Sequence, residues 1–132
     1  MLNSFPQLLV FSFFAPTLLR VAVALFFFYI AYKQYGRRHE IARLRFPIVG
    51  RGVWIALLAV GFHTAIGAML FFGYYTQVGA LLGSVGLLKG WWLNKRYPSV
   101  VILPNSAILA LLALCLSLLL TGAGALAVDL PL

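Results

Sequence analysis

The stretch AIGAMLFFGYYTQVGALLGS, residues 65–84, decides the fold. It is apolar and glycine-containing at both ends, and only GYYTQ, residues 73–77, interrupts it. Five residues leave room for a tight turn and for little else, so we expect the flanking apolar runs to form an antiparallel helical hairpin. The first run extends back to Val53, and the second continues forward to Asn94.

Composition places this hairpin in a membrane rather than in water. The chain has 132 residues, of which 64% are hydrophobic and 9% charged, and its mean hydropathy is +1.03. A soluble domain has about 25% charged residues, and no water-soluble core of this length could hide so much apolar surface. Four apolar runs cover residues 13–35, 53–72, 78–94 and 104–122, and the third of them is short for a span. We therefore predict an all-α fold, a single transmembrane domain over residues 1–132 that forms an integral membrane four-helix bundle.

The basic residues indicate how the spans are oriented. Nine of the ten lie in two clusters beside the apolar runs. One cluster, at and after the end of the first run, contains Lys33, Arg37, Arg38, Arg43, Arg45 and Arg51, and the other, around the end of the third run, contains Lys89, Lys95 and Arg96. The positive-inside rule assigns both clusters to the cytoplasm, so we predict that both termini are outside. The net charge of +8 is then juxtamembrane charge, and we expect no nucleic-acid partner.

The first basic loop has a second predicted role. Residues 36–52, GRRHEIARLRFPIVGRG, interleave arginines with apolar side chains, which is typical of a short amphipathic segment on the inner leaflet. We expect each arginine to contribute about 1 kcal/mol of attraction to anionic lipid. The predicted lipid contacts are Arg37, Arg38, Arg43, Arg45 and Arg51. The alternative is that these arginines only fix the topology.

Helix packing is predicted from glycines. Gly79, Gly83, Gly86 and Gly90 recur at i, i+4, i+7 and i+11, two GxxxG motifs end to end, which would let another backbone approach closely. The preceding helix offers a matching face made of Ala56, Ala59, His63 and Gly67. We expect the hairpin to pack these two faces together. A contact between copies of the chain in a homo-oligomer is the alternative use of the stripe.

His63 is the candidate site residue. It lies near the middle of the second predicted span, where an ionisable side chain is costly and is a functional candidate by default. We consider a quinone or proton site there, against a structural role as a neutral imidazole bonded to Thr64, Ser84 or a backbone carbonyl. A haem or metal would need further ligands in the membrane, and His39 belongs to the loop, so we predict no metal. No other cofactor is evident.

Arg20 and Asp129 are predicted to form an ion pair. With both termini outside, Arg20 lies about one turn into the first span, and Asp129 lies just past the outer end of the fourth. They carry opposite charges, and a planar guanidinium suits a carboxylate. A fold-back of residues 122–124 would let the carboxylate reach inward and fasten the C-terminus over the bundle. The alternative is that Arg20 extends to lipid phosphate and that Asp129 lies in a disordered tail.

Several stretches together resemble the DoxX family of small four-span membrane proteins. PTLLRVAVALFFFYIAYK, residues 16–33, looks like that family's first helix, and residues 65–84 are similar to its glycine-rich hairpin. GAGALAVD, residues 122–129, resembles a C-terminal glycine-rich segment that closes on Asp. The family often has a glutamate just before the hairpin glycines, where this chain reads FHTAIGA, residues 62–68, so a role of that glutamate does not carry over.

The resemblance implies a redox-linked accessory subunit. Some members of that family are subunits of thiosulfate:quinone oxidoreductase and others associate with thiol-oxidative defence enzymes, so redox subunits are the implied partners. The implied location is a bacterial or archaeal cytoplasmic membrane. The chain has no nucleophile–base pair, paired carboxylates or phosphate-binding loop, and we expect no catalysis by it alone.

Three functions stay open on the sequence. The first is a non-catalytic subunit that touches quinone through His63; the second is a small transporter or lipid-interacting protein; the third is a structural or assembly subunit. A quinone site predicts an apolar cleft that opens to lipid beside His63. A transporter predicts a polar cavity that reaches one aqueous side.

Overall fold

The computed structural model describes residues 12, 14–44, 50–98, 102–122, 124 and 127–128. Its helices are α1 (Ala15–Gly36), α2 (Arg38–Arg43), α3 (Val53–Phe72), α4 (Thr76–Arg96) and α5 (Asn105–Thr121). The four long helices among these begin and end within two residues of the predicted spans. The all-α class is therefore confirmed for the described part of the chain.

Two of the described helices, α1 and α3, are long and apolar enough to cross a membrane, judged by length and composition. The 22 residues of α1 reach about 33 Å at 1.5 Å per residue, close to the thickness of a hydrocarbon core. α5 is apolar but has only 17 residues, and α4 carries lysines and an asparagine toward its end. Helix length and composition thus support two of the four predicted spans.

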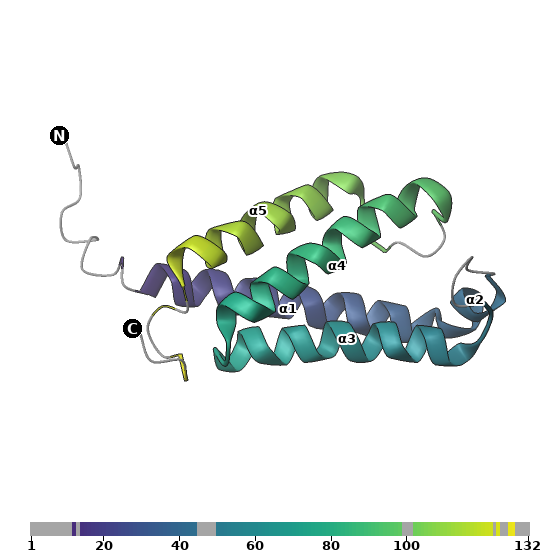
Figure 1. Ribbon diagram of the computed structural model, residues 1–132, viewed down its shortest axis with the longest axis horizontal. Helices are drawn as coiled ribbons and strands as arrows, with labels where there is room; N and C mark the ends of the chain where they lie inside the picture. The colour runs from purple at the N-terminus through teal and green to yellow at the C-terminus, as the bar shows by residue number, and fades with distance from the viewer. Residues whose placement is uncertain are drawn as a thin grey trace.

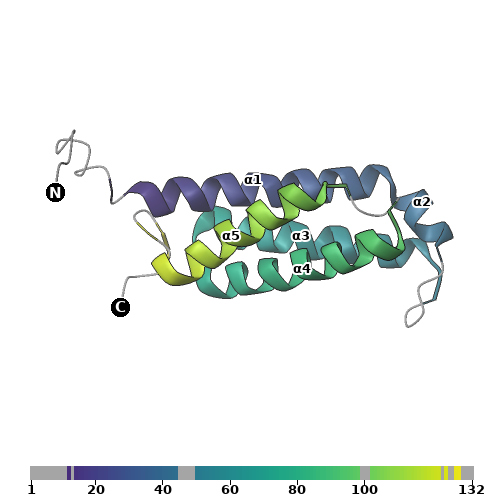
Figure 2. The same ribbon diagram turned by 90° about the horizontal axis from the view of Figure 1, so that it is seen from above.

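The four long helices run side by side with alternating directions (Figures 1 and 2). The start of α1, the α3–α4 turn and the end of α5 lie at one end, called the turn end below. α2 lies at the other end, called the basic end. α1 packs most closely on α3, and α4 packs most closely on α5. α4 starts beside α3 at the turn and then diverges from it, as Figure 1 shows.

The α3–α4 turn takes only three residues, Gly73–Tyr75. Gly73 has a φ of 66°, in the left-handed region, and its N–H donates a hydrogen bond to the Leu70 carbonyl at 3.3 Å. A glycine in this conformation ends a helix and reverses the chain. Tyr75 is also left-handed, with a φ of 49°, so that α4 begins at Thr76, two residues earlier than predicted.

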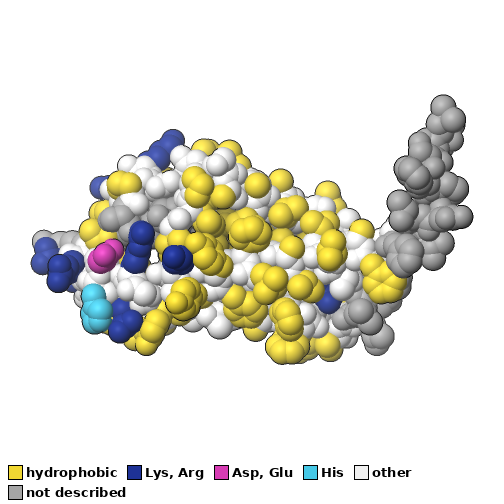
Figure 3. All heavy atoms as spheres, turned by 180° about the vertical axis from the view of Figure 1, so that it is seen from behind, with side chains coloured by type: hydrophobic (Ala, Val, Ile, Leu, Met, Phe, Trp, Pro, Cys, Tyr) yellow, Lys and Arg dark blue, Asp and Glu magenta, His cyan; other side chains and the backbone are white. Residues whose placement is uncertain are grey.

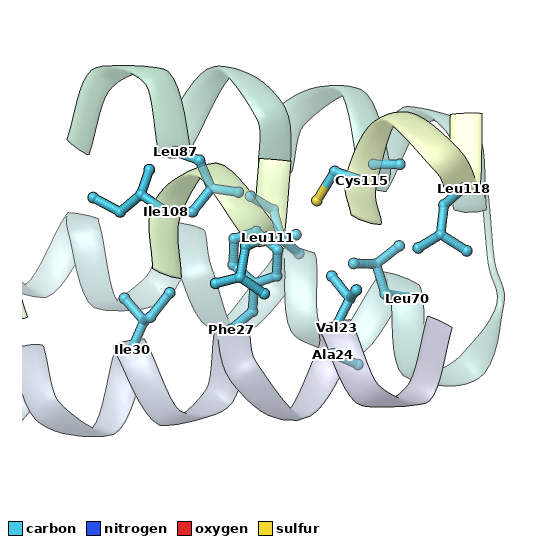
Figure 4. Packing of buried hydrophobic residues seen from close by; sticks show 12 residues of the cluster. Val23, Ala24, Phe27, Ile30, Leu70, Leu87, Ile108, Leu111, Cys115 and Leu118 are labelled. Atoms are coloured by element: carbon cyan, nitrogen blue, oxygen red, sulfur yellow. The ribbon is translucent and has the colours of Figure 1, made fainter. Parts of the chain in front are cut away.

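The core is formed by all four long helices (Figure 4). Its centre is the ring of Phe27 in α1, which is fully buried. This ring lies against Gly83 of α4, where an added Cβ would be 2.8 Å from Phe27 Cζ and 3.5 Å from the sulfur of Cys115 in α5. Three helices therefore meet at Gly83.

The observed packing of the glycines differs from the predicted pairing of two small-residue faces. Gly67 of α3 lies against α1, at the Phe28 ring and the Ala24 carbonyl oxygen. In α4, Gly79 and Gly86 face side chains of α3, whereas Gly83 faces α1 and α5. A Cβ added to Gly90 would have nothing within 4 Å. Because α4 diverges from α3, the α4 stripe does not lie along the small-residue face of α3, and its members meet different neighbours.

Candidate functional site: an apolar cavity beside His63

A cavity of about 940 Å³ lies between α3 and α4, toward the basic end. Apolar side chains form most of its lining, with Leu58 and Phe62 on α3 and Val85, Leu87 and Leu93 on α4. The side chains of Leu58, Phe62 and Val85 are also exposed, so the cavity opens at the surface between the two helices. Its size falls within the range of about 300–1,000 Å³ that is usual for ligand pockets.

The sequence explains why this space is empty of side chains. Several of the residues that line the cavity are small: Gly86 and Gly90 on α4, and Ala59 and Gly61 on α3. Their side chains are a methyl group or a hydrogen atom, so they fill little of the space between the helices. The divergence of α4 then leaves a gap that such small residues cannot fill. Toward the turn end the gap between α3 and α4 narrows, because the Phe62 ring lies against Gly86. A Cβ added to Gly86 would be 3.1 Å from Phe62 Cε1.

His63 lines the cavity from α3 and is half-buried. Its Nδ1 lies 2.7 Å from the carbonyl oxygen of Ala59, one turn earlier in the same helix. The imidazole stacks on Phe27 with 6.0 Å between ring centroids, and the Phe62 ring approaches it edge-on at 5.6 Å. Of the predicted structural partners, the backbone carbonyl is the one that His63 contacts. Thr64 and Ser84 instead donate to carbonyls of their own helices.

The basic end of the cavity is more polar than its interior. Gln34 of α1 and Lys89 of α4 belong to the lining there, as do the indole rings of Trp54 and Trp92. The side-chain oxygen of Gln34 is buried and has no hydrogen-bond partner among the described residues. Trp54 and Trp92 are half exposed. This ring of amphipathic groups is typical of a position near the edge of a bilayer.

The cavity can form hydrogen bonds with a ligand in mostly apolar surroundings that are open on one side. His63 and Gln34 can bind a polar group, and aromatic rings can stack on a planar ligand. No group of three His, Cys, Asp or Glu side chains that could hold a metal occurs in the described part of the chain. The lone Cys115 is buried in the core, away from the cavity lining.

The predicted lipid-binding arginines lie at the basic end. Figure 3 shows most of the visible lysine and arginine side chains gathered there, while apolar side chains are spread over the middle of that face. The predicted amphipathic segment is helical over α2, which buries Ile41 and exposes Arg37 and Arg43 beside it. Arg38 donates a hydrogen bond to the Tyr35 carbonyl at 3.1 Å. Arg51 is exposed as well, and Arg45 lies outside the described residues. Their lipid contacts stay a prediction.

Arg20 is buried at the turn end, with 2% of its surface exposed. Its guanidinium lies beside the α3–α4 turn, because a Cβ added to Gly73 would be 2.7 Å from Arg20 Cζ. That same Cβ would be 2.9 Å from the Cα of Ala127, so the chain beyond α5 folds back onto the turn. Asp129 lies outside the described residues. The Arg20–Asp129 ion pair stays a prediction. The chain does return to the region of Arg20 at Ala127, since both residues lie beside Gly73.

The sequence pointed to His63 and, for a quinone site, to an apolar cleft beside it, but not to the other residues that line this cavity. Gln34 and Lys89 were not predicted to share a site with His63, since they lie on α1 and α4. Gly90 was one available signal for the cavity in the sequence, because it continues the glycine stripe of α4 past the glycines that contact other helices.

Comparisons of the chain with protein-family models, with curated proteins and with solved structures find no match.

Proposed function

We propose that this chain is an integral membrane protein that binds a lipid-soluble quinone in the cavity beside His63, as a non-catalytic accessory subunit of a membrane redox system. All four long helices span the bilayer, with the basic end in the cytoplasm and both termini outside. The observation that carries the proposal is the apolar cavity with His63 in its wall.

A membrane location is supported by the surface as well as by helix composition. Large apolar side chains point outward along the long helices, and two of them, Leu18 and Leu120, are exposed by 75% and 89%. In water an apolar surface this extensive would cause association, whereas lipid covers it without cost. The positive charges at one end and the apolar sides of the molecule (Figure 3) fit the positive-inside orientation.

The lining of the cavity favours a quinone over a transported polar solute. A transport pathway needs polar groups along its length. Here Gln34 and Lys89 lie at the basic end, and the interior walls are apolar apart from His63. Such walls suit a planar ring with an isoprenoid tail. The opening between α3 and α4 gives the ligand a lateral route from lipid. The resemblance of residues 16–33 and 65–84 to the DoxX family supports a redox partner of the same class.

Tryptophan quenching by a short-chain quinone tests the proposal. Trp54 and Trp92 line the cavity, so decylubiquinone bound there should quench their fluorescence in protein reconstituted into lipid nanodiscs. Quinone free in the lipid adds only a non-saturating component. We expect saturable quenching for the parent protein.

Two glycine variants locate the quenching. Gly90→Leu fills the cavity from a position with open space around it, and it should remove the saturable component while the helix content is kept. Gly36→Leu is the matched control, because Gly36 is also helical and also has open space, but does not line the cavity. Quenching that is equally saturable in Gly90→Leu would show that quinone binds elsewhere.

A further inference from the structure

The hydrogen bond of His63 fixes which of its two ring nitrogens carries the proton. Nδ1 lies 2.7 Å from the Ala59 carbonyl oxygen, and a carbonyl oxygen can only accept. Nδ1 must therefore be the protonated nitrogen. A charged imidazole is costly at mid-span, so the ring is neutral, and Nε2 then has a lone pair and no proton.

Nε2 is the polar atom that His63 has left for a ligand. No described residue forms a hydrogen bond with it, and the ring is held in place from two sides by Phe27 and Phe62. A neutral imidazole held in this way accepts a hydrogen bond but cannot donate one from Nε2. The buried side-chain oxygen of Gln34, in the same cavity, is a second acceptor without a partner among the described residues.

We infer that the cavity selects a lipid-soluble ring that carries a hydroxyl group, a phenol or a hydroquinone, over the same ring with a carbonyl or an ether oxygen. The hydroxyl proton is donated to Nε2 of His63. A carbonyl oxygen in that position would face the lone pair with no proton between them, and would leave both groups unsatisfied. The inference rests on the proposed function, because it concerns the same cavity, and it adds that the reduced form of a quinone binds more tightly than the oxidised form.

A redox-inert pair of ligands tests the selectivity. 4-Nonylphenol and 4-nonylanisole differ only in the hydroxyl proton and the methyl group that replaces it, and each can compete with decylubiquinone in the quenching assay. We expect the phenol to compete at about one-tenth of the concentration that the ether needs, as is usual for the loss of one buried hydrogen bond. Decylubiquinol, kept reduced under argon, should outcompete decylubiquinone by a similar factor. 1-Decanol, which has a hydroxyl group but no ring, should compete weakly; competition equal to that of the phenol would overturn the requirement for a ring.

Replacement of His63 separates its role from that of the cavity. In His63→Gln the side chain offers both a donor and an acceptor, so the preference for phenol should fall to about twofold or less while decylubiquinone still binds. A preference that persists in His63→Gln would overturn the assignment to His63. Equal competition by phenol and ether in the parent protein would overturn the inference but leave the quinone site intact. If the parent shows no saturable quenching at all, the proposed function itself fails.

Nitrogen NMR of the parent protein gives a second readout that needs no variant of His63. With ¹⁵N-labelled histidine in nanodiscs, the His63 ring should show a protonated Nδ1 and an unprotonated Nε2. His39, which is exposed in α2, serves as the reference and is assigned with His39→Gln. The opposite tautomer, or a doubly protonated ring, at neutral pH would overturn the inference.

Discussion

Alanine substitutions at two glycines of α4 measure how tightly the helices are packed. Gly83 and Gly90 lie seven residues apart on the same helix, and both are replaced by the same side chain. At Gly83 the new Cβ would be 2.8 Å from Phe27 Cζ and 3.2 Å from its Cε2, whereas the usual distance between carbon atoms in contact is about 3.5–4.0 Å. Phe27 is fully buried, so its ring has little freedom to move away.

The expected difference in the free energy of unfolding follows from this overlap. Overpacking in a dense core costs about 1–3 kcal/mol. The gain in helix propensity from glycine to alanine, about 1 kcal/mol, is common to both positions and cancels in the comparison. At Gly90 the new methyl group meets nothing within 4 Å. We therefore expect Gly83→Ala to be less stable than Gly90→Ala by about 1–3 kcal/mol.

Reversible unfolding in mixed micelles, with rising mole fraction of SDS and far-UV circular dichroism as the readout, measures both variants under identical conditions. Gly90→Ala should be as stable as the parent or more so. Equal stability of the two variants would mean that α4 does not meet α1 and α5 at Gly83. The arrangement of the helices described above would then be wrong.

Three further outcomes are expected. Cysteines introduced by Asn3→Cys and Leu130→Cys should react with a membrane-impermeant reagent added outside. If both are protected from the reagent, the prediction that both termini are outside is wrong. A double-mutant cycle on stability with Arg20→Ala and Asp129→Ala should give a coupling of about 0.5–3 kcal/mol, and strictly additive losses would exclude the ion pair. Arg43→Ala should weaken the enrichment of anionic over zwitterionic lipid around the protein by about fivefold, which corresponds to about 1 kcal/mol. Native mass spectrometry measures this enrichment. If it is unchanged, Arg43 does not bind anionic lipid and serves only to fix the topology.

The helices and the hairpin were predictable because hydropathy and turn length are properties of short stretches of sequence and do not depend on distant residues. The apolar runs correctly located all four long helices, and GYYTQ correctly predicted the short turn. The turn is shorter than predicted because Tyr75 adopts a left-handed conformation that favours glycine or asparagine. Nothing in its residue type indicates this.

The partners of the glycines were only partly predictable, because a glycine permits close approach without specifying which helix approaches. Gly79 and Gly86 face α3, the expected partner, whereas Gly67 packs on α1 and Gly83 packs on α1 and α5. The angle at which α4 leaves α3 is set by the whole set of side chains between the helices. The cavity depends on that angle, so the sequence indicated His63 and a conditional cleft beside it, but neither the size of the cavity nor Gln34 and Lys89 as parts of its lining.

Photoaffinity labelling with an azido-quinone shows directly whether a quinone occupies the cavity beside His63. The reagent is activated in nanodiscs that contain the parent protein, and the labelled residues are identified by peptide mass spectrometry. We expect labels on both α3 and α4 at residues that line the cavity, around Phe62–His63 and Val85–Lys89, and loss of these labels in Gly90→Leu. Labels confined to outward-facing side chains such as Leu18 and Leu120, and unchanged in Gly90→Leu, would contradict this expectation.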